Sequence, residues 1–447
     1  MPEPELKREL GLRDLTLFAI ACIAGPRWIA IAAHAGPASV TLWMAAAVFF
    51  AVPLGAAVQS LMRKYPGAGG LYLWTRNDFG PWHGFLAFWT YWFSIALTLP
   101  SSAMATMSTS AYAFGPSYAH LADSRVYVLF ASLAAIGIAL GTNLVGMRVG
   151  KWTENLGGIT TWILGVVLVA TAAVVYSRQG SATAMDLQPQ WNWDTLSFFG
   201  SIAYALSGME FIGMMGAEIR NPLRVAGPAI WIATLFVTLF YILTTVALLV
   251  LIRPESIQIL HGLADAGDVA AKLFGWIWIT PLIAFVFVVN SIGGWGGMGA
   301  AVSRMPYAAG ADALLPAAFG RVHPRWHTPY VSILAFGAVT CVLLLLLQIG
   351  ETMRAAFQTL VSLMVIAGFI PYLYLFGSAW KANRKIAAIC GLATTILAIV
   401  SSLVPTPDIT NVWAFEIKIV AGTALIIGAA WLVYRSAQRR AASLSQT

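Results

Sequence analysis

The sequence predicts an all-α polytopic membrane protein, because of its composition, its repeated apolar runs and the helix-breaking residues within those runs. Of 447 residues, 59% are hydrophobic and 10% are charged, whereas soluble domains have about 45–50% and about 25%. Runs of about 20 apolar residues, the length that crosses a hydrocarbon core about 30 Å thick, recur along the whole chain. We therefore expect one integrated domain over residues 1–447, with the lipid bilayer as its surroundings.

Twelve apolar runs are predicted to be transmembrane helices. Those of the first half lie near residues 14–34, 38–62, 81–113, 125–143, 153–176 and 194–217. Those of the second half lie near residues 228–252, 279–309, 329–348, 355–378, 384–404 and 412–435. The loop near 253–278 is amphipathic and predicts an interfacial helix.

The basic residues are distributed unevenly between the two sets of loops. Most of the 26 Lys and Arg residues fall on one side if both termini are cytoplasmic, and translocation of cationic loops is disfavoured. We therefore expect an integral plasma (inner) membrane protein with cytoplasmic termini. The net charge of +8 does not indicate nucleic-acid binding, because no basic tract with interleaved aromatics is present.

Two of the predicted spans carry helix breakers in the middle of apolar sequence. The first span contains Gly25-Pro26-Arg27-Trp28, and the sixth contains Ser207-Gly208-Met209-Glu210. Proline removes a backbone hydrogen bond, and unpaired backbone groups are tolerated at membrane depth only where they line a cavity. A structural kink is the alternative for Gly25-Pro26 alone. The pairing of the two breaks indicates a midplane binding site between inverted repeats.

A broken helix exposes free N–H groups at one half-helix and free C=O groups at the other. The carboxylate of a zwitterion can accept from the N–H groups, and its ammonium can donate to the C=O groups. The sequence therefore favours a small amine-bearing solute, such as an amino acid.

Three charged residues near the breaks each admit more than one interpretation. Glu210 is costly within a span, so it should face a cavity or a partner; it suits proton relay, gating, recognition of a cation, or a structural pair with Arg27. Arg27 suits an anionic group of the solute, a fixed positive charge, or structural pairing. Glu218 precedes Arg220 at the cytoplasmic mouth, where we expect a solvated or gate-forming ion pair.

Three aromatic residues are candidates for covering the solute. Trp28 and Tyr204 adjoin the breaks, although many aromatics in a chain that is 12% aromatic only pack or lie at the interface. Trp295 stands within Gly293-Gly294-Trp295-Gly296-Gly297, where the absence of side chains leaves space for a solute against the indole.

Several longer motifs resemble those of the amino acid, polyamine and organocation superfamily, over nearly the whole chain. They are Lys64-Tyr65-Pro66-Gly67-Ala68-Gly69-Gly70-Leu71-Tyr72, the sixth-span break followed by Glu218 and Asn221-Pro222, Gly293-Gly294-Trp295 followed by Leu315-Pro316, and Ile370-Pro371-Tyr372-Leu373-Tyr374. The resemblance implies inverted five-helix repeats (spans 1–5 and 6–10) over about 14–176 and 194–378, with broken helices 1 and 6. Two further helices would follow over about 384–435.

The resemblance also implies roles for individual residues. Substrate would be held around Ile23, Gly25, Pro26 and Arg27 and around Ser207 and Gly208, and Ser362 falls where the tenth helix contacts substrate. Tyr204, Glu210 and Trp295 are similar to the gate, the sixth-helix glutamate and the middle aromatic of arginine/agmatine-type antiporters. The Arg27 region resembles the first-helix Leu-Arg motif of glutamate/GABA-type antiporters.

Three positions depart from the family pattern. Pro26-Arg27 replaces the second half of the usual Gly-Ser-Gly, and Ser60 stands where a glutamate is common. The fifth-helix lysine linked to proton coupling in several members is replaced by Thr161, with Glu154 a turn or two away. The resemblance therefore leaves the coupling ion, proton or sodium, open.

The sequence thus predicts a secondary active transporter of amino acids, working by alternating access as an exchanger or an ion-coupled symporter. A carrier of polyamines or decarboxylated amines is the alternative, and a solute-sensing receptor is a weaker one. We expect no enzyme activity, metal or cofactor, because no phosphate-binding loop, zinc motif or nucleophile-base set is present. The oligomeric state is left open.

Overall fold

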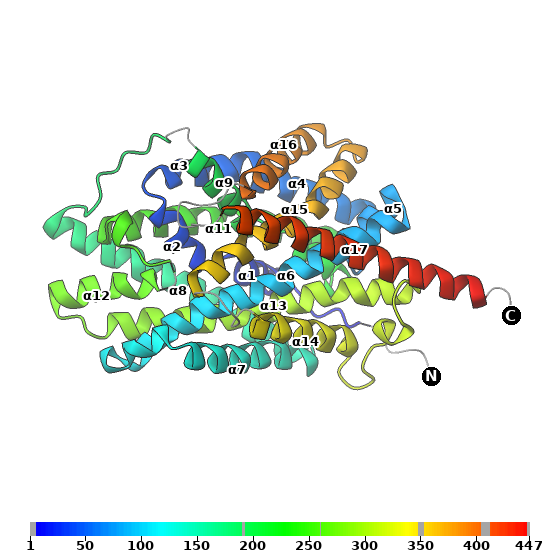
Figure 1. Ribbon diagram of the computed structural model, residues 1–447, viewed down its shortest axis with the longest axis horizontal. Helices are drawn as coiled ribbons and strands as arrows, with labels where there is room; N and C mark the ends of the chain where they lie inside the picture. The colour runs from blue at the N-terminus through cyan, green and yellow to red at the C-terminus, as the bar shows by residue number, and fades with distance from the viewer. Residues whose placement is uncertain (1–5, 190–192, 260, 347–352, 404–411, 445–447) are drawn as a thin grey trace.

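The regular structure of this protein is helical. The computed structural model describes residues 6–189, 193–259, 261–346, 353–403 and 412–444. Within these ranges the β-structure is limited to one isolated bridge between Leu10 and Ile219. Most of the long helices run along the long axis of the molecule (Figure 1), as expected of a bundle that crosses a membrane. The predicted all-α class is confirmed.

The first half of the chain begins with two short helices in place of one long one. The α-helices of this half are α1 (Leu12–Ile23), α2 (Arg27–His34), α3 (Ala38–Ala46), α4 (Val52–Lys64), α5 (Leu71–Phe79), α6 (Pro81–Ser110), α7 (Arg125–Leu144), α8 (Met147–Gln179), α9 (Trp193–Ala205) and α10 (Glu210–Met214). A π-helical stretch, η1 (Ala47–Ala51), joins α3 to α4, and η2 (Ala111–Phe114), η3 (Pro116–Asp123) and η4 (Gly216–Glu218) are 3₁₀ turns.

The second half contains longer unbroken helices. They are α11 (Pro222–Leu251), α12 (Gly262–Phe274), α13 (Ile279–Ala311), α14 (Tyr330–Leu346), α15 (Met353–Lys381), α16 (Lys385–Ser402) and α17 (Val412–Leu444), with short turns η5 (Pro254–Ser256) and η6 (Ala317–Gly320). The helix α12 lies in the loop where the sequence predicts an interfacial helix.

Eight helical segments are individually long and apolar enough to cross a membrane, and the bent pair α1 and α2 adds a ninth, among the residues that the structure describes. Each of the twelve predicted ranges contains helix, but α6, α14 and the pair α9 and α10 do not pass the same test of length and hydropathy. The protein is an integral membrane protein. The count of twelve spans stays a prediction.

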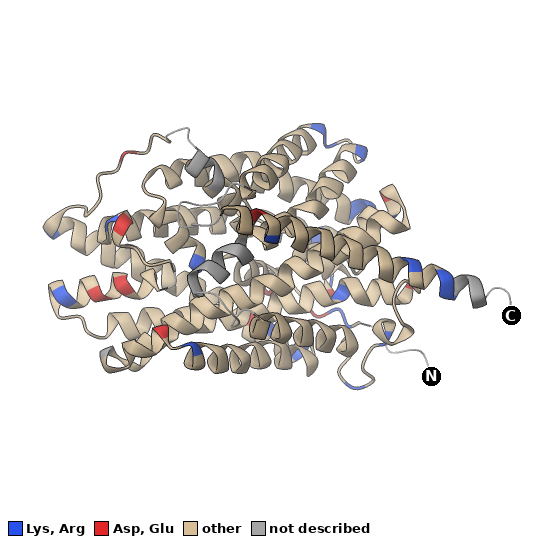
Figure 2. Ribbon diagram, in the orientation of Figure 1, with Lys and Arg blue, Asp and Glu red and all other residues tan. Residues whose placement is uncertain are grey.

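The charged residues mark the two ends of the bundle. Both ends of the described chain lie toward the same end of the molecule (Figure 1). Lys and Arg gather at that end, and the acidic residues of α12 lie at the other (Figure 2). This arrangement agrees with the uneven distribution of basic residues between the loops.

Glycines set the spacing between the helices that surround the first break. A methyl carbon added at Gly293 of α13 would sit 2.7 Å from Cα of Gly157 in α8, and one at Gly294 would sit 2.4 Å from the carbonyl oxygen of Ala21 in α1. A methyl carbon at Gly158 would sit 2.6 Å from the carbonyl oxygen of Leu17. The helices α1, α8 and α13 therefore meet backbone to backbone, as small residues allow in membrane bundles.

Candidate functional site

The two predicted helix breaks meet in the middle of the protein. The first span bends by 44° between α1 and α2, and the sixth stops at Ala205 and resumes at Glu210. Gly208 has φ +119°, a conformation that side chains rarely adopt, and a methyl carbon there would sit 2.7 Å from Cγ1 of Ile23. The predicted broken helices are present, and their irregular backbone segments are in contact.

A small cavity of about 40 Å³ lies beside the two breaks. Its wall includes five of the nine residues predicted to bind substrate, together with Trp28, which was predicted to cover the solute. The five are Ile23, Gly25, Arg27, Tyr204 and Ser207. Pockets for drug-sized ligands usually measure about 300–1,000 Å³. A solute as large as an amino acid therefore requires part of this wall to move.

Arg27 brings a positive charge to the cavity wall without a carboxylate partner among the described residues. Its side chain is 4% exposed. Nη1 donates to the carbonyl oxygen of Thr98 (3.2 Å) and to Oγ of Ser101 (2.7 Å), both on α6. The guanidinium carbon lies 4.7 Å from the centre of the Trp28 ring. All these partners are neutral, so the buried charge is only partly compensated.

Glu210 is turned toward its own helix break and does not form the pair with Arg27 that the sequence left open. It is fully buried. Oε2 accepts from the backbone N–H of Gly208 (3.1 Å), and Oε1 accepts from the hydroxyl of Tyr91. Neither the ion pairs nor the cavity wall of the described structure include Glu210. It therefore holds the start of α10, where an anion is favourable.

Tyr241 of α11 is a site residue that the sequence did not reveal. Its hydroxyl donates to the carbonyl oxygen of Ile23 (2.8 Å) and accepts from the N–H of Gly25 (2.9 Å). Its ring stacks on Trp43, with centroids 4.4 Å apart. Tyr241 thus satisfies backbone groups on both sides of the first break, which we had expected to be free for a solute.

The two aromatic residues beside the breaks form one side of the cavity. The rings of Trp28 and Tyr204 are 6.0 Å apart. The hydroxyl of Tyr204 shares hydrogen bonds with Oγ of Ser94 (2.9 Å) and with Oγ1 of Thr98 (3.2 Å). Because Thr98 is also an acceptor for Arg27, Tyr204 and Arg27 are linked through one turn of α6.

Trp295 lies behind the cavity and reaches it through one intermediate. Its Nε1 donates to Oγ of Ser102, which lines the cavity. The glycines around Trp295 do not leave the open space that the sequence suggested: a methyl carbon at Gly297 would meet Sγ of Cys22 at 2.4 Å, and Gly294 is filled by Ala21. These glycines admit neighbouring helices, because close packing of α1 against α13 takes up the volume.

Glu218 forms a buried ion pair, with a partner that the sequence did not indicate. Nε and Nη2 of Arg304, on α13, each donate to one Glu218 oxygen at 2.8 Å. Each side chain is 1% exposed, so the solvated alternative is wrong. The N-terminal segment packs here too, since the N–H groups of Glu9 and Leu10 donate to the carbonyl oxygen of Glu218.

The remaining predicted residues lie outside the cavity wall. Pro26 forms the N-terminal boundary of α2. Ser362 is half-buried on α15, two residues before Met364, whose carbonyl oxygen accepts from Ser94. Thr161 is buried on α8 and accepts from Nδ2 of Asn290 at 2.6 Å. Glu154 is buried on the same face of α8, two turns earlier.

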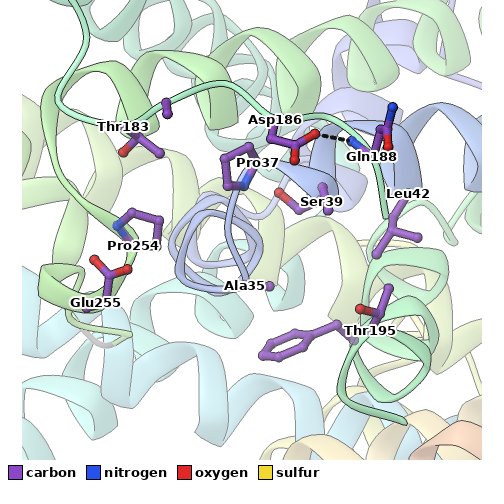
Figure 3. Close-up of a pocket in the computed structure, with 13 residues that line it drawn as sticks. Ala35, Pro37, Ser39, Leu42, Thr183, Asp186, Gln188, Thr195, Pro254 and Glu255 are labelled. Atoms are coloured by element: carbon purple, nitrogen blue, oxygen red, sulfur yellow. Dashed lines mark hydrogen bonds between the residues drawn. The ribbon is translucent and has the colours of Figure 1, made fainter. Parts of the chain in front are cut away.

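A larger cavity, of about 480 Å³, opens on the surface where α2 turns into α3 (Figure 3). Its charged residues, Asp186 and Glu255, are exposed. Asp186 accepts from the backbone of Gln188 (3.0 Å) (Figure 3). No charged side chain is buried in its wall, in contrast to the smaller cavity that Arg27 lines. The described residues also contain no group of His, Cys, Asp and Glu placed to hold a metal.

Known proteins similar to this chain are transporters. An uncharacterized transporter of Legionella pneumophila is 23% identical over 95% of this chain and 96% of its own length. The Asc-type amino acid transporter 1 of Mus musculus is 25% identical over 78% of this chain and 66% of its own length. The crystal structure of MhsT in complex with L-phenylalanine superposes with a TM-score of 0.62, at 15% identity, covering 96% of this chain and 99% of MhsT. That likeness shows a shared fold.

The family assignment follows from a match over most of the sequence. The profile described as "Amino acid permease" matches residues 10–426. This match agrees with the resemblance found in the motifs, and with two broken helices meeting at a buried cavity. The protein is a secondary transporter of amino acids, and it belongs to the amino acid permease family.

Proposed function

We propose that this protein moves amino acids across the plasma (inner) membrane by alternating access, with both termini in the cytoplasm, and that Arg27 binds the carboxylate of the solute. The observation that carries this proposal is a buried guanidinium on the cavity wall whose described partners are all neutral. A carboxylate beside it would supply the missing charge and accept two parallel hydrogen bonds.

The same charge argues against the polyamine alternative. A polyamine carries only positive charges, and like charges repel strongly at the low effective dielectric constant of a buried site. The carboxylate that could offset this repulsion, Glu210, is already engaged by Tyr91 and Gly208 and is not part of the cavity wall. An amino acid, which carries its own carboxylate, fits the described charges better.

The ammonium group of the solute would face the backbone of the two breaks. Ile23 and Ser207 line the cavity, and carbonyl oxygens at half-helix ends favour a cation. The carbonyl oxygen of Ile23 already accepts from Tyr241 but has a second lone pair. Trp28 and Tyr204 would cover the solute, because their rings form the adjacent wall.

Counterflow into proteoliposomes tests the proposed function. Vesicles loaded with an unlabelled amino acid should accumulate labelled amino acid faster than empty vesicles, whereas a receptor would give no accumulation. Putrescine should neither drive nor compete with this exchange. Accumulation of putrescine without accumulation of any amino acid would contradict the proposal.

The substitution Arg27→Gln tests the role of the guanidinium. It removes the charge but keeps hydrogen-bonding capacity, so we expect amino-acid counterflow to fall by at least about tenfold, the factor that corresponds to roughly 1.4 kcal/mol of lost binding. Arg321→Gln, at an exposed arginine, is the control and should transport normally. Unchanged affinity in Arg27→Gln would remove Arg27 from the site.

A further inference from the structure

Glu154 is a buried ionisable side chain to which the proposed function gives no role. It lies in the first part of α8 and is 0% exposed. Residues 154, 157, 158 and 161 share one face of a helix, and Gly157 and Gly158 are the residues at which α8 meets α13 and α1. Glu154 therefore faces the seam between α1 and α13, and both of these helices contribute residues to the wall of the small cavity.

The carboxyl group of Glu154 has no hydrogen-bond partner among the described residues. Both Oε1 and Oε2 are inaccessible to solvent and unpaired. An ionised carboxylate in such a place is costly unless it is paired, and buried groups usually neutralise themselves when they have no partner. The protonated acid is therefore the form that this environment tolerates.

The charged groups that face Glu154 from the neighbouring elements are already engaged. Arg304 of α13 is bound through two nitrogens to Glu218 of η4. Asp14 of α1 accepts from Asn155 (3.0 Å) and lies 3.9 Å from Lys151. Arg304, Glu218 and Asp14 are the charged residues with the strongest electrostatic influence on Glu154. Asn155 and Lys151 are partners of Asp14. No cation is free to compensate an ionised Glu154 in this arrangement of the described residues.

A neighbouring acceptor also lacks a donor. Nδ2 of Asn143 donates to the carbonyl oxygens of Gly296 (2.8 Å) and Ala139 (3.2 Å), which leaves Oδ1 facing α8. Oδ1 is buried and unpaired among the described residues. A methyl carbon added at Gly150 would sit 2.7 Å from Asn143 Oδ1 and 3.6 Å from Glu154 Oε1. Asn143 Oδ1 and Glu154 Oε1 therefore lie on the same side of Gly150. Of these two groups, only a protonated Glu154 could donate a hydrogen bond there.

We propose that Glu154 binds a proton and releases it once in each transport cycle, so that amino-acid movement is coupled to proton movement. The coupling rests on the proposed function, since it needs a transported solute. The carboxylate takes one proton from water on one side of the membrane and returns it on the other; no bond to carbon changes.

The residues around Glu154 lead to the cavity in two directions. Asn143 holds the backbone of Gly296, next to Trp295, whose indole donates to Ser102 at the cavity wall. On the other side, Gly158 packs on Leu17 of α1, the half-helix that precedes Arg27. Loss of the proton would leave a carboxylate that competes with Glu218 for Arg304. This competition would favour separation of α8 from α1 and α13.

The test measures exchange and proton movement separately in the same proteoliposomes. Counterflow at a fixed pH reports solute exchange, and a pH-sensitive dye trapped inside the vesicles reports proton movement during net uptake. In Glu154→Gln, which keeps the shape of the neutral acid, we expect exchange to persist, proton movement to be lost, and the pH profile of uptake to become flat. Glu416→Gln, at a half-buried carboxylate on α17, is the matched control and should keep both activities.

The outcomes distinguish the two proposals. No exchange by the unaltered protein would overturn the proposed function. Solute exchange by the unaltered protein without proton movement would overturn the proton site. Proton movement together with substrate in the Glu154→Gln variant would also overturn it. A purely structural Glu154 would give Glu154→Gln a lower unfolding temperature and an unchanged pH profile, which also overturns the site.

Discussion

Arg27 and Glu154 are both buried, and neither has a partner of opposite charge among the described residues. Buried charges in proteins are usually paired, because an unpaired buried charge costs several kcal/mol. Glu218 and Arg304, in contrast, satisfy each other through two hydrogen bonds. Our two proposals assign a ligand to each of the unpaired groups: a carboxylate to Arg27, and a proton to Glu154.

His261 supplies a pH-dependent contact outside the membrane-spanning segments. Burial of the imidazole lowers its pKa, but the hydrogen bond to Asp265 (3.3 Å) and the charges of Asp265, Asp123 and Asp268 outweigh burial, so the pKa is raised above its ordinary value of 6.5. A raised folded-state pKa means that the protonated form stabilises the protein fully below the unfolded-state pKa. This contribution is lost as the pH rises through the folded-state pKa.

We therefore expect Asp265→Asn to lower the pKa of His261 and to reduce stability at acidic pH, with little effect at alkaline pH where His261 is neutral. The histidine signals in NMR spectra give the pKa, and thermal unfolding at several pH values gives the stability. His261→Gln should lose the same pH-dependent part. An effect of Asp265→Asn that is larger at alkaline pH would contradict the assignment.

At the scale of helices, the ion pair between Arg304 and Glu218 ties the end of α13 to the turn after α10. We expect Glu218→Gln to lower stability by about 3–5 kcal/mol, because it leaves a buried guanidinium without its counter-charge. The more exposed pair of Arg76 and Asp312 offers a control, since partly exposed pairs contribute at most about 1 kcal/mol. Unfolding temperatures in detergent should therefore fall further for Glu218→Gln than for Asp312→Asn. Equal decreases in unfolding temperature would show that the ion pair of Arg304 and Glu218 does not hold α13 to the turn after α10.

The helix breaks are local in sequence, and the sequence predicted them correctly. Glycine, proline and a charge within an apolar run are sufficient to interrupt a helix at Gly25-Pro26 and at Ser207-Gly208. What fills each break is decided by other helices. Tyr241 is 216 residues from Gly25, and nothing in its own apolar surroundings distinguishes it from a tyrosine that merely packs.

For the whole molecule, composition and the repeated apolar runs predicted the helical class, and motifs predicted the family. The sequence could not predict how glycines are used, because a missing side chain is compatible with a cavity or with close packing. Around Trp295 it proved to be close packing. The partner of Glu218 was missed for a related reason: Arg304 is 86 residues away, whereas Arg220 is near in sequence.

The short segment before α1 is bound to the loop after α10 by three backbone hydrogen bonds, from Glu9, Leu10 and Arg220. The carbonyl oxygen of Glu218, at the buried ion pair, accepts two of them. For anyone producing the protein, this segment is a poor place for an affinity tag or a fluorescent label, and trimming it would remove these three hydrogen bonds beside the buried ion pair. Such additions belong at the opposite terminus, beyond α17.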